Sequence, residues 1–126
     1  MPEARSILIV DDSASVRRQL RDALEADGFV VIEAENGARG LAIAAETVVH
    51  LMIVDVNMPV MDGIEMIGKV RDIPAYKTTP IFVLTTESGT EAAKRGKGVG
   101  ATAWIVKPVK PDVLIKGIRT VLATRT

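Results

Sequence analysis

The chain has no cysteine, a single histidine and few aromatic side chains: one Trp, one Tyr and two Phe among 126 residues. Without cysteine it can form no disulfide and use no thiolate chemistry, which fits a reducing compartment. The 16 Lys and Arg balance the 16 Asp and Glu, so no net charge attracts the protein to nucleic acid or to an anionic membrane. No apolar run approaches the roughly 20 residues of a membrane span.

What the sequence does contain is a large apolar fraction, 48% of its residues, which is typical of a folded domain rather than a disordered chain. The length predicts one domain, residues 1–126, that buries roughly two-thirds of its unfolded surface. The first five residues lack the apolar core of a signal peptide. We therefore expect a cytoplasmic protein, monomeric, with no nucleic-acid or membrane partner.

The apolar segment Leu51–Val54 runs without a polar break and is followed by Asp55. Such a run is typical of a strand buried on both faces, as in a parallel sheet. Four more segments have a strand pattern: Ser6–Val10, Phe29–Ala34, Pro80–Thr85 and Ala103–Val106. A helix is predicted after each strand: one closed by Gly28, one around Leu41, one from about 63, a weak one over 88–97, and one from 111. Strand and helix thus alternate five times, which predicts a parallel sheet with helices on both faces.

Polar side chains stand where the predicted strands end. They are Asp11 and Asp12 after the first strand, Asp55 after the third, Thr85 and Thr86 at the fourth, and Lys107 after the fifth. The carboxyl ends of parallel strands share one edge of the sheet, so we expect these groups to meet there. Clustered carboxylates repel one another, and Mg²⁺, which prefers oxygen ligands, would relieve that repulsion. With a hydroxyl and an ammonium opposite, the set predicts a phosphoryl acceptor site with one Asp as nucleophile.

Five pieces of the sequence, in order, resemble the receiver domain of two-component response regulators, across essentially the whole chain. They are Ile9–Ser13, Val54–Pro59, Met61–Gly63, Leu84–Thr86 and Val106–Pro108. The resemblance implies a doubly wound, flavodoxin-like α/β fold, with a five-stranded parallel sheet in the order 2-1-3-4-5 and five helices. It also implies a cis peptide bond between Lys107 and Pro108.

The resemblance assigns acceptor and metal roles to the residues that match the family's motifs. Asp55 would attack a phosphohistidine on a partner kinase and become an aspartyl phosphate. Asp12, Asp55 and the backbone carbonyl of Asn57 would bind Mg²⁺, and Asp11 would bind it directly or through a water.

The resemblance also assigns the residues that respond to the phosphoryl group. Lys107 would pair with a phosphoryl oxygen, and Thr85 would move its hydroxyl onto the group once it arrives. Trp104 holds the place of the switch aromatic, usually Tyr or Phe, that turns inward when the threonine moves. Asn57 and Glu87 hold positions that tune spontaneous hydrolysis.

The implied partners are a histidine kinase of the chemotaxis type, a possible phosphatase, and a target bound by the face of the fourth helix, fifth strand and fifth helix. The segments Thr85–Ser88 and Ala103–Pro108 are most similar to chemotaxis regulators, whose target is the flagellar motor switch protein or a competing phosphate sink. The alternative is a single-domain receiver in a non-chemotaxis phosphorelay or stress-signalling circuit. Val109 stands where many relatives have Phe, and we expect this difference to alter contacts with partners.

Two other classes of protein fit the sequence less well. A Mg²⁺-dependent phosphatase with an Asp nucleophile would carry a second Asp two residues later, where Asn57 cannot serve as a general acid. The family resemblance implies self-phosphorylation and autodephosphorylation, and no metabolic enzyme. A degenerate scaffold would lack the acidic pair, the acceptor or the lysine, and all are present. His50, the only histidine, is predicted to be a surface residue.

Overall fold

A computed structural model of the chain describes residues 5–56, 58, 61–86, 98 and 100–123. Its strands are β1 (Ser6–Val10), β2 (Val30–Ala34), β3 (Leu51–Asp55), β4 (Ile81–Thr85) and β5 (Ala103–Val106). The α-helices within the described residues are α1 (Ala14–Ala26), α2 (Gly37–Glu46), α3 (Gly63–Arg71) and α5 (Pro111–Ala123), with a 3-10 helix, η1 (Pro74–Tyr76). All strands are parallel, in the order β2-β1-β3-β4-β5. The predicted fold class and strand order are confirmed, and the weak helix predicted over 88–97 lies outside the described residues.

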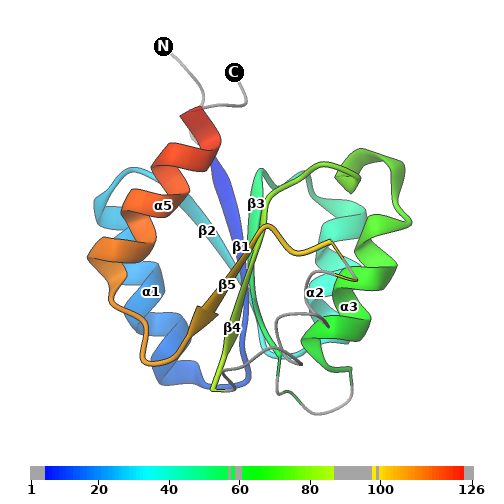
Figure 1. Cartoon of the computed structure of the whole chain (residues 1–126), viewed down its shortest axis with the longest axis horizontal. Helices are drawn as coiled ribbons and strands as arrows, with labels where there is room; N and C mark the ends of the chain where they lie inside the picture. Colours follow the sequence, from blue (N-terminus) through cyan, green and yellow to red (C-terminus); the bar gives the residue numbers. More distant parts are fainter. Residues whose placement is uncertain (1–4, 57, 59–60, 87–97, 99, 124–126) are drawn as a thin grey trace.

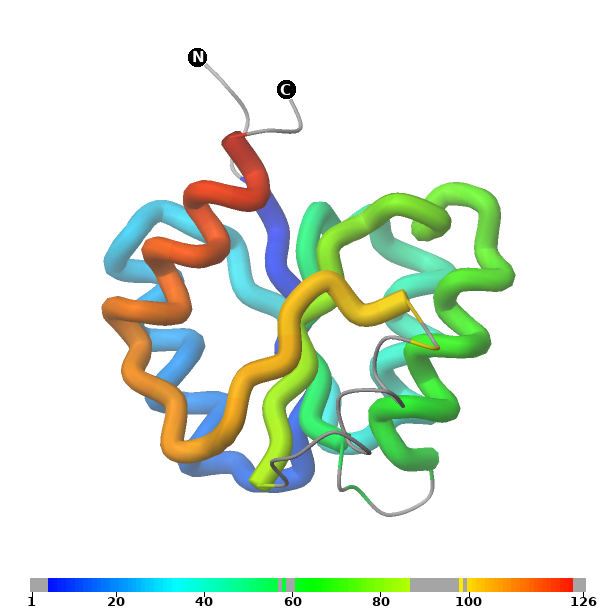
Figure 2. Tube along the Cα trace, viewed as in Figure 1, coloured from blue at the N-terminus to red at the C-terminus, as the bar shows by residue number. Residues whose placement is uncertain are grey.

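The sheet lies between two helical layers (Figures 1 and 2), with α1 and α5 on one face and α2 and α3 on the other. Successive residues of a strand point to opposite faces. In β1, Ile7 and Ile9 accordingly join the core under α1 and α5, whereas Leu8 and Val10 join the core under α2 and α3. Because both faces are covered, the central strands must be apolar at every position, which explains the unbroken apolar runs in the sequence.

Polar caps begin three helices close to the carboxyl edge of the sheet. Ser13 Oγ accepts a hydrogen bond from the Val16 amide (3.3 Å) at the start of α1. Asn36 Oδ1 does the same for α2, and Asp62 Oδ1 for α3 (2.8 Å each). Such caps satisfy amides that have no partner inside the helix. They make the turns out of β1, β2 and β3 sharp, so that the polar residues of these turns remain at one edge.

Three details differ from the predictions made from the sequence. β2 begins at Val30 rather than Phe29, and β3 includes Asp55. His50 is half-buried, and its Nδ1 accepts a hydrogen bond from the Ser6 amide (2.9 Å), so it is more than a surface residue.

A contact that the sequence did not predict joins η1 to α2: the Tyr76 hydroxyl lies 2.6 Å from the carbonyl oxygen of Ala44 and can donate its proton there. None of the helices in the described part of the chain has the length and hydrophobicity of a membrane span.

Candidate functional site

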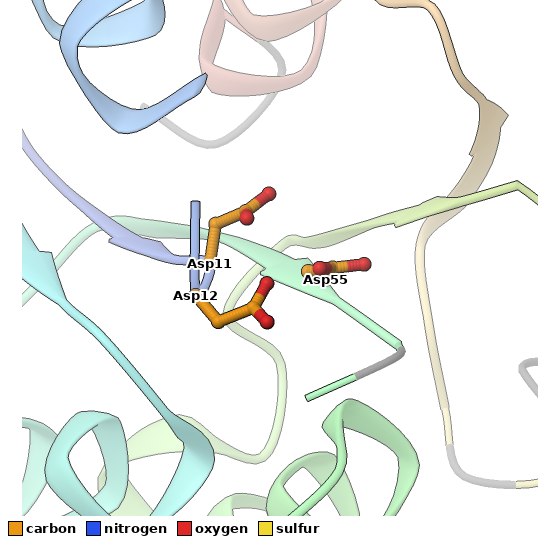
Figure 3. Close-up of side chains that lie close together, drawn as sticks. All are labelled: Asp11, Asp12 and Asp55. Atoms are coloured by element: carbon orange, nitrogen blue, oxygen red, sulfur yellow. The ribbon is translucent and has the colours of Figure 1, made fainter. Parts of the chain in front are cut away.

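The structure brings Asp11, Asp12 and Asp55 together at the carboxyl edge of the sheet (Figure 3). One carboxylate oxygen of each lies within 4.8 Å of the others. The register explains the contact: Val10 of β1 pairs with Val54 of β3, so the next residue of each strand lies beside its neighbour. Asp11 and Asp55 are buried, and Asp12 is exposed. The predicted meeting of these three residues is thus found, while their roles remain predictions.

Lys107 provides the positive charge of this cluster. Its Nζ lies 3.3 Å from Asp11 Oδ2 and 3.4 Å from Asp55 Oδ2, and 21% of its side chain is exposed. The Lys107 amide donates to the carbonyl of Thr85 (2.7 Å), and the bond to Pro108 is cis, as the family resemblance implied. Burial of the ammonium acts to lower the pKa of Lys107, but attraction by Asp11 and Asp55 outweighs it and raises that pKa. Lys107 is therefore held as a cation between two buried carboxylates.

Four different atoms of Asp11 make polar contacts with neighbouring residues. Its amide donates to the Ala34 carbonyl of β2 (3.1 Å), and its Oδ1 accepts from the Ser13 amide (2.9 Å). Its Oδ2 faces Lys107, and its backbone carbonyl accepts from Arg17 Nη1 (2.5 Å). Each of these bonds holds a different atom, so neither the backbone nor the side chain of Asp11 can rotate without breaking one.

Arg17 is itself held by an ion-pair network that the sequence interpretation missed. Its Nε donates to Glu33 Oε1 (3.0 Å), and Arg21 Nη1 donates to Glu33 Oε2 (2.7 Å). The hydrogen bond from Arg21 lowers the pKa of Glu33, partial burial opposes this, and Arg17 adds to it. The sequence did contain a signal for this network. Arg17 and Arg21 lie one turn apart in a predicted helix, and Glu33 lies in the strand that follows and packs beside that helix.

The two predicted switch residues lie on neighbouring strands. Thr85 is buried at the end of β4, one residue beyond Leu84, which pairs with Asp55. Trp104 of β5 pairs with Val83 of β4 and packs, partly buried, against the core under α2 and α3. Its Nε1 is buried and has no hydrogen-bond partner among the residues that the structure describes.

Two further predicted site residues, Asn57 and Glu87, lie outside the described residues. The metal role of the Asn57 carbonyl and the tuning roles of both residues are therefore not addressed by this geometry.

The donor set of the cluster fits a hard divalent cation. The cluster found within the described residues consists of three carboxylates, all oxygen donors, without imidazole or thiolate. Three formal negative charges face the single positive charge of Lys107. Mg²⁺ binds through carboxylates and retains waters that phosphate oxygens can replace. An excess of negative charge on oxygen donors at an open edge is what such an ion requires.

A groove of about 690 Å³ separates β5 from α5. Its lining is mostly apolar and includes Phe82, Ile105, Val109 and Leu114, with Lys110 and Lys116 also among the lining residues. Val106 and Val113, which also line it, are 44% and 63% exposed. Grouped exposed apolar side chains of this kind are typical of a surface that binds another molecule.

Comparison with known proteins gives consistent matches along the chain. The family profile of the response regulator receiver domain matches residues 7–119. Chemotaxis protein CheY1 of Helicobacter pylori (strain ATCC 700392 / 26695) is 36% identical over 120 residues, which cover 94% of this chain and 97% of that protein. The structure of Vibrio cholerae chemotaxis protein CheY4 has a TM-score of 0.91 at 43% identity, covering 94% of this chain and 99% of that one. Transcriptional regulatory protein ResD of Bacillus subtilis (strain 168) is 36% identical over 116 residues, a match that spans 47% of its length.

Proposed function

The chain belongs to the response regulator receiver domain family, and from that premise we propose that it is a phosphorylation-dependent switch whose acceptor is Asp55. The family is one of signalling domains, not of metabolic enzymes. The observation that carries the proposal is the buried arrangement at the sheet edge, where Lys107 faces Asp11 and Asp55 at 3.3 and 3.4 Å. An arrangement that gathers three carboxylates at the ends of two strands is costly for folding alone, and phosphoryl transfer gives it a use.

The proposed reaction transfers a phosphoryl group to a carboxylate oxygen of Asp55. That oxygen attacks phosphorus, the bond from phosphorus to the donor atom breaks, and the donor leaves with the bonding electrons. In the family the donor is a phosphohistidine of a kinase. Lys107, already beside Asp55 Oδ2, would pair with a phosphoryl oxygen and neutralise part of its charge. Thr85 would then turn its hydroxyl to the acquired group.

Asp12, Asp55 and the Asn57 carbonyl would hold Mg²⁺, with Asp11 beside them. When bound, the ion supplies further positive charge against the phosphoryl oxygens. Asp11 directly follows β1 and Asp55 ends β3, and the pairing of these two strands supports a shared site.

Incubation with Mg²⁺ and acetyl phosphate is expected to add about 80 Da, one phosphoryl group, to the intact protein. The Asp55→Asn variant should show no gain, because an amide is a poor nucleophile. Asp62→Asn is the matched control, since Asp62 caps α3 and Asn preserves that role. The measurement is intact-mass spectrometry with and without EDTA. A gain that persists in Asp55→Asn would disprove the assignment, and steady phosphate release from many monoesters would indicate a phosphatase.

We place the output on the face that contains β5 and α5. The apolar groove between them and the exposed Val106 and Val113 support this. The remaining part of the predicted face, residues 88–97, lies outside the described residues. The matches to chemotaxis proteins over almost their whole length favour a chemotaxis kinase as donor and the flagellar motor switch as target. The match to part of ResD favours the alternative, a receiver in another phosphorelay.

Trp104→Ala is expected to take up the phosphoryl group as the unaltered protein does but to lose most of the phosphorylation-dependent gain in partner affinity. The reason is position: Trp104 lies in β5, the strand that contributes Ala103 and Ile105 to the groove, while its own side chain packs on the other face of the sheet, against the core under α2 and α3. Its loss is therefore expected to act on β5 and not on the proposed acceptor. Trp104→Phe restores the aromatic type usual in the family and should keep the gain. Binding of motor-switch and kinase components, with and without acetyl phosphate, would measure it. An unchanged phosphorylation-dependent gain in affinity in Trp104→Ala would refute this role. Which component the phosphorylated protein binds would distinguish chemotaxis from other circuits.

A further inference from the structure

The Asp12 carboxylate is the least constrained group of the acidic cluster. It is exposed, and no hydrogen bond or ion pair of its side chain is found within the described residues. Its direction therefore depends on the backbone that carries it. The peptide group that leads into Asp12 contains the carbonyl of Asp11, and a peptide group is planar. Whatever holds the Asp11 carbonyl oxygen therefore fixes the plane from which Asp12 projects.

Arg17 holds that oxygen from the first turn of α1. Its Nη1 donates to the Asp11 carbonyl (2.5 Å), while its Nε donates to Glu33 Oε1 of β2 (3.0 Å). Only 17% of the Arg17 side chain and 27% of the Glu33 side chain are exposed. Glu33 is fixed in turn by Arg21 (2.7 Å). The Arg17 guanidinium therefore connects the loop after β1 to a side chain of strand β2.

This contact requires the shape of arginine as well as its charge. A guanidinium presents donors in a rigid planar fork, so one side chain reaches two acceptors in different directions. Lysine has the same charge but a single nitrogen, which cannot replace Nε and Nη1 at the same time. The neighbouring Arg18 is a natural contrast, because its side chain is 81% exposed and lies 3.8 Å from Asp22 on the same helix.

We propose that Arg17, anchored by Glu33, is a positioning residue that orients the Asp12 carboxylate and thereby sets the affinity of the acidic cluster for a divalent cation. The inference rests on the proposed function, because it attributes part of the affinity of the proposed Mg²⁺ site to Arg17. The proposed contact makes Arg17 strengthen cation binding, whereas its positive charge alone would weaken it. A positive charge beside a cation site weakens cation binding through repulsion, whereas a positioning contact strengthens it.

The test measures the Mg²⁺ dissociation constant of the whole protein by calorimetry and by the fluorescence of Trp104, the only tryptophan. Arg17→Gln is expected to weaken Mg²⁺ binding about 10-fold, the size of effect seen when groups behind a metal ligand are removed. Arg17→Lys should weaken it by a similar factor although its charge is kept. The control Arg18→Gln removes the same charge from an exposed position and should leave binding unchanged or slightly tighter.

Urea unfolding of each variant shows that the titrations are made on folded protein. Should Arg17→Gln fail to fold, Arg17→Lys decides the matter, because it retains the charge and the aliphatic stem. Binding in both Arg17 variants as tight as in Arg18→Gln would overturn the inference. That result differs from failure of the proposed function, in which the unaltered protein itself would neither bind Mg²⁺ nor gain mass from acetyl phosphate.

Discussion

Replacing Lys107 with methionine is expected to lower the free energy of unfolding of the Mg²⁺-free protein by about 2–4 kcal/mol, somewhat below the range for a fully buried pair because part of the side chain is exposed. The Lys107 ammonium is the positive group between the buried Asp11 and Asp55 carboxylates. Methionine keeps the apolar stem and removes the charge, so two carboxylates would remain together without it. The measurement is urea unfolding in the presence of EDTA.

Lys77→Met is the control for this experiment. Lys77 is exposed in the segment after η1, and substitution of such a residue typically changes stability by less than about 0.5 kcal/mol. Mg²⁺ provides a second comparison, because a ligand that binds only the folded state stabilises by RT ln(1 + [L]/Kd), about 1.4 kcal/mol at ten times Kd. With the competing ammonium removed, Lys107→Met should gain more from Mg²⁺ than the unaltered protein. Equal stability of the two methionine variants would contradict the role given to Lys107.

The contribution of Lys107 to the free energy of unfolding depends on pH because its pKa is raised in the folded protein. A group whose pKa is higher in the folded state stabilises fully below its unfolded value, about 10.4 for lysine. That stabilisation is lost as the pH rises through the raised value. The difference between the unaltered protein and Lys107→Met should therefore persist from neutral pH to about pH 10 and decrease only in more alkaline solution.

Gly63→Ala is expected to destabilise the protein by about 2–3 kcal/mol, a large overpacking effect. A Cβ at Gly63 would lie far inside van der Waals contact with the Asp55 carbonyl oxygen, and 3.0 Å from Val54 Cγ1. Both atoms belong to β3, whose central position leaves no room to retreat. Helix α3 cannot move away freely either, since the Gly63 amide donates to the Val56 carbonyl (3.0 Å). The main chain of Asp55, the proposed acceptor, must shift, so phosphoryl gain from acetyl phosphate should also fall.

Gly68→Ala on the same helix is the matched control, with the opposite expected sign. A Cβ there has no other atom within 4 Å among the described residues, and replacing glycine inside a helix by alanine typically stabilises by about 0.5–1 kcal/mol. Urea midpoints and mass gain would be measured for both variants. A stability change of the same sign in both would show that helix propensity, and not the contact with Asp55, decides the outcome at Gly63.

The sheet and its polar edge could be predicted because they follow from short-range pattern. Unbroken apolar runs such as Leu51–Val54 require cover on both faces, and the residue that ends each run must lie at the common edge. That Asp55 and Asp11 lie at the same edge of the sheet therefore follows from strand alternation, whereas their contact also requires β1 and β3 to be neighbours. The order of the strands did not follow from the pattern, and came from the family resemblance.

The contacts that hold the site in place could not be predicted in the same way. The bond from Arg17 to the Asp11 carbonyl depends on a side-chain rotamer and on the register of β2 against β1, where Ile9 pairs with Glu33. Neither is encoded in hydrophobic periodicity. The Tyr76 hydroxyl, which reaches the end of α2, is likewise 32 positions away from the Ala44 carbonyl in sequence. Hydrogen bonds between elements this distant are set only when the layers have packed.

The ion pair between Asp11 and Lys107 joins residues 96 positions apart, and this spacing has a consequence for biosynthesis. A ribosome delivers both acidic residues of the first loop long before the lysine that neutralises them. The earlier strands already form a continuous sheet, to which the last strand adds at the outer edge beside β4. A nascent chain halted before that strand would hold mutually repelling carboxylates without their ammonium, so the charges at this edge are balanced only once Lys107, directly after β5, has been added.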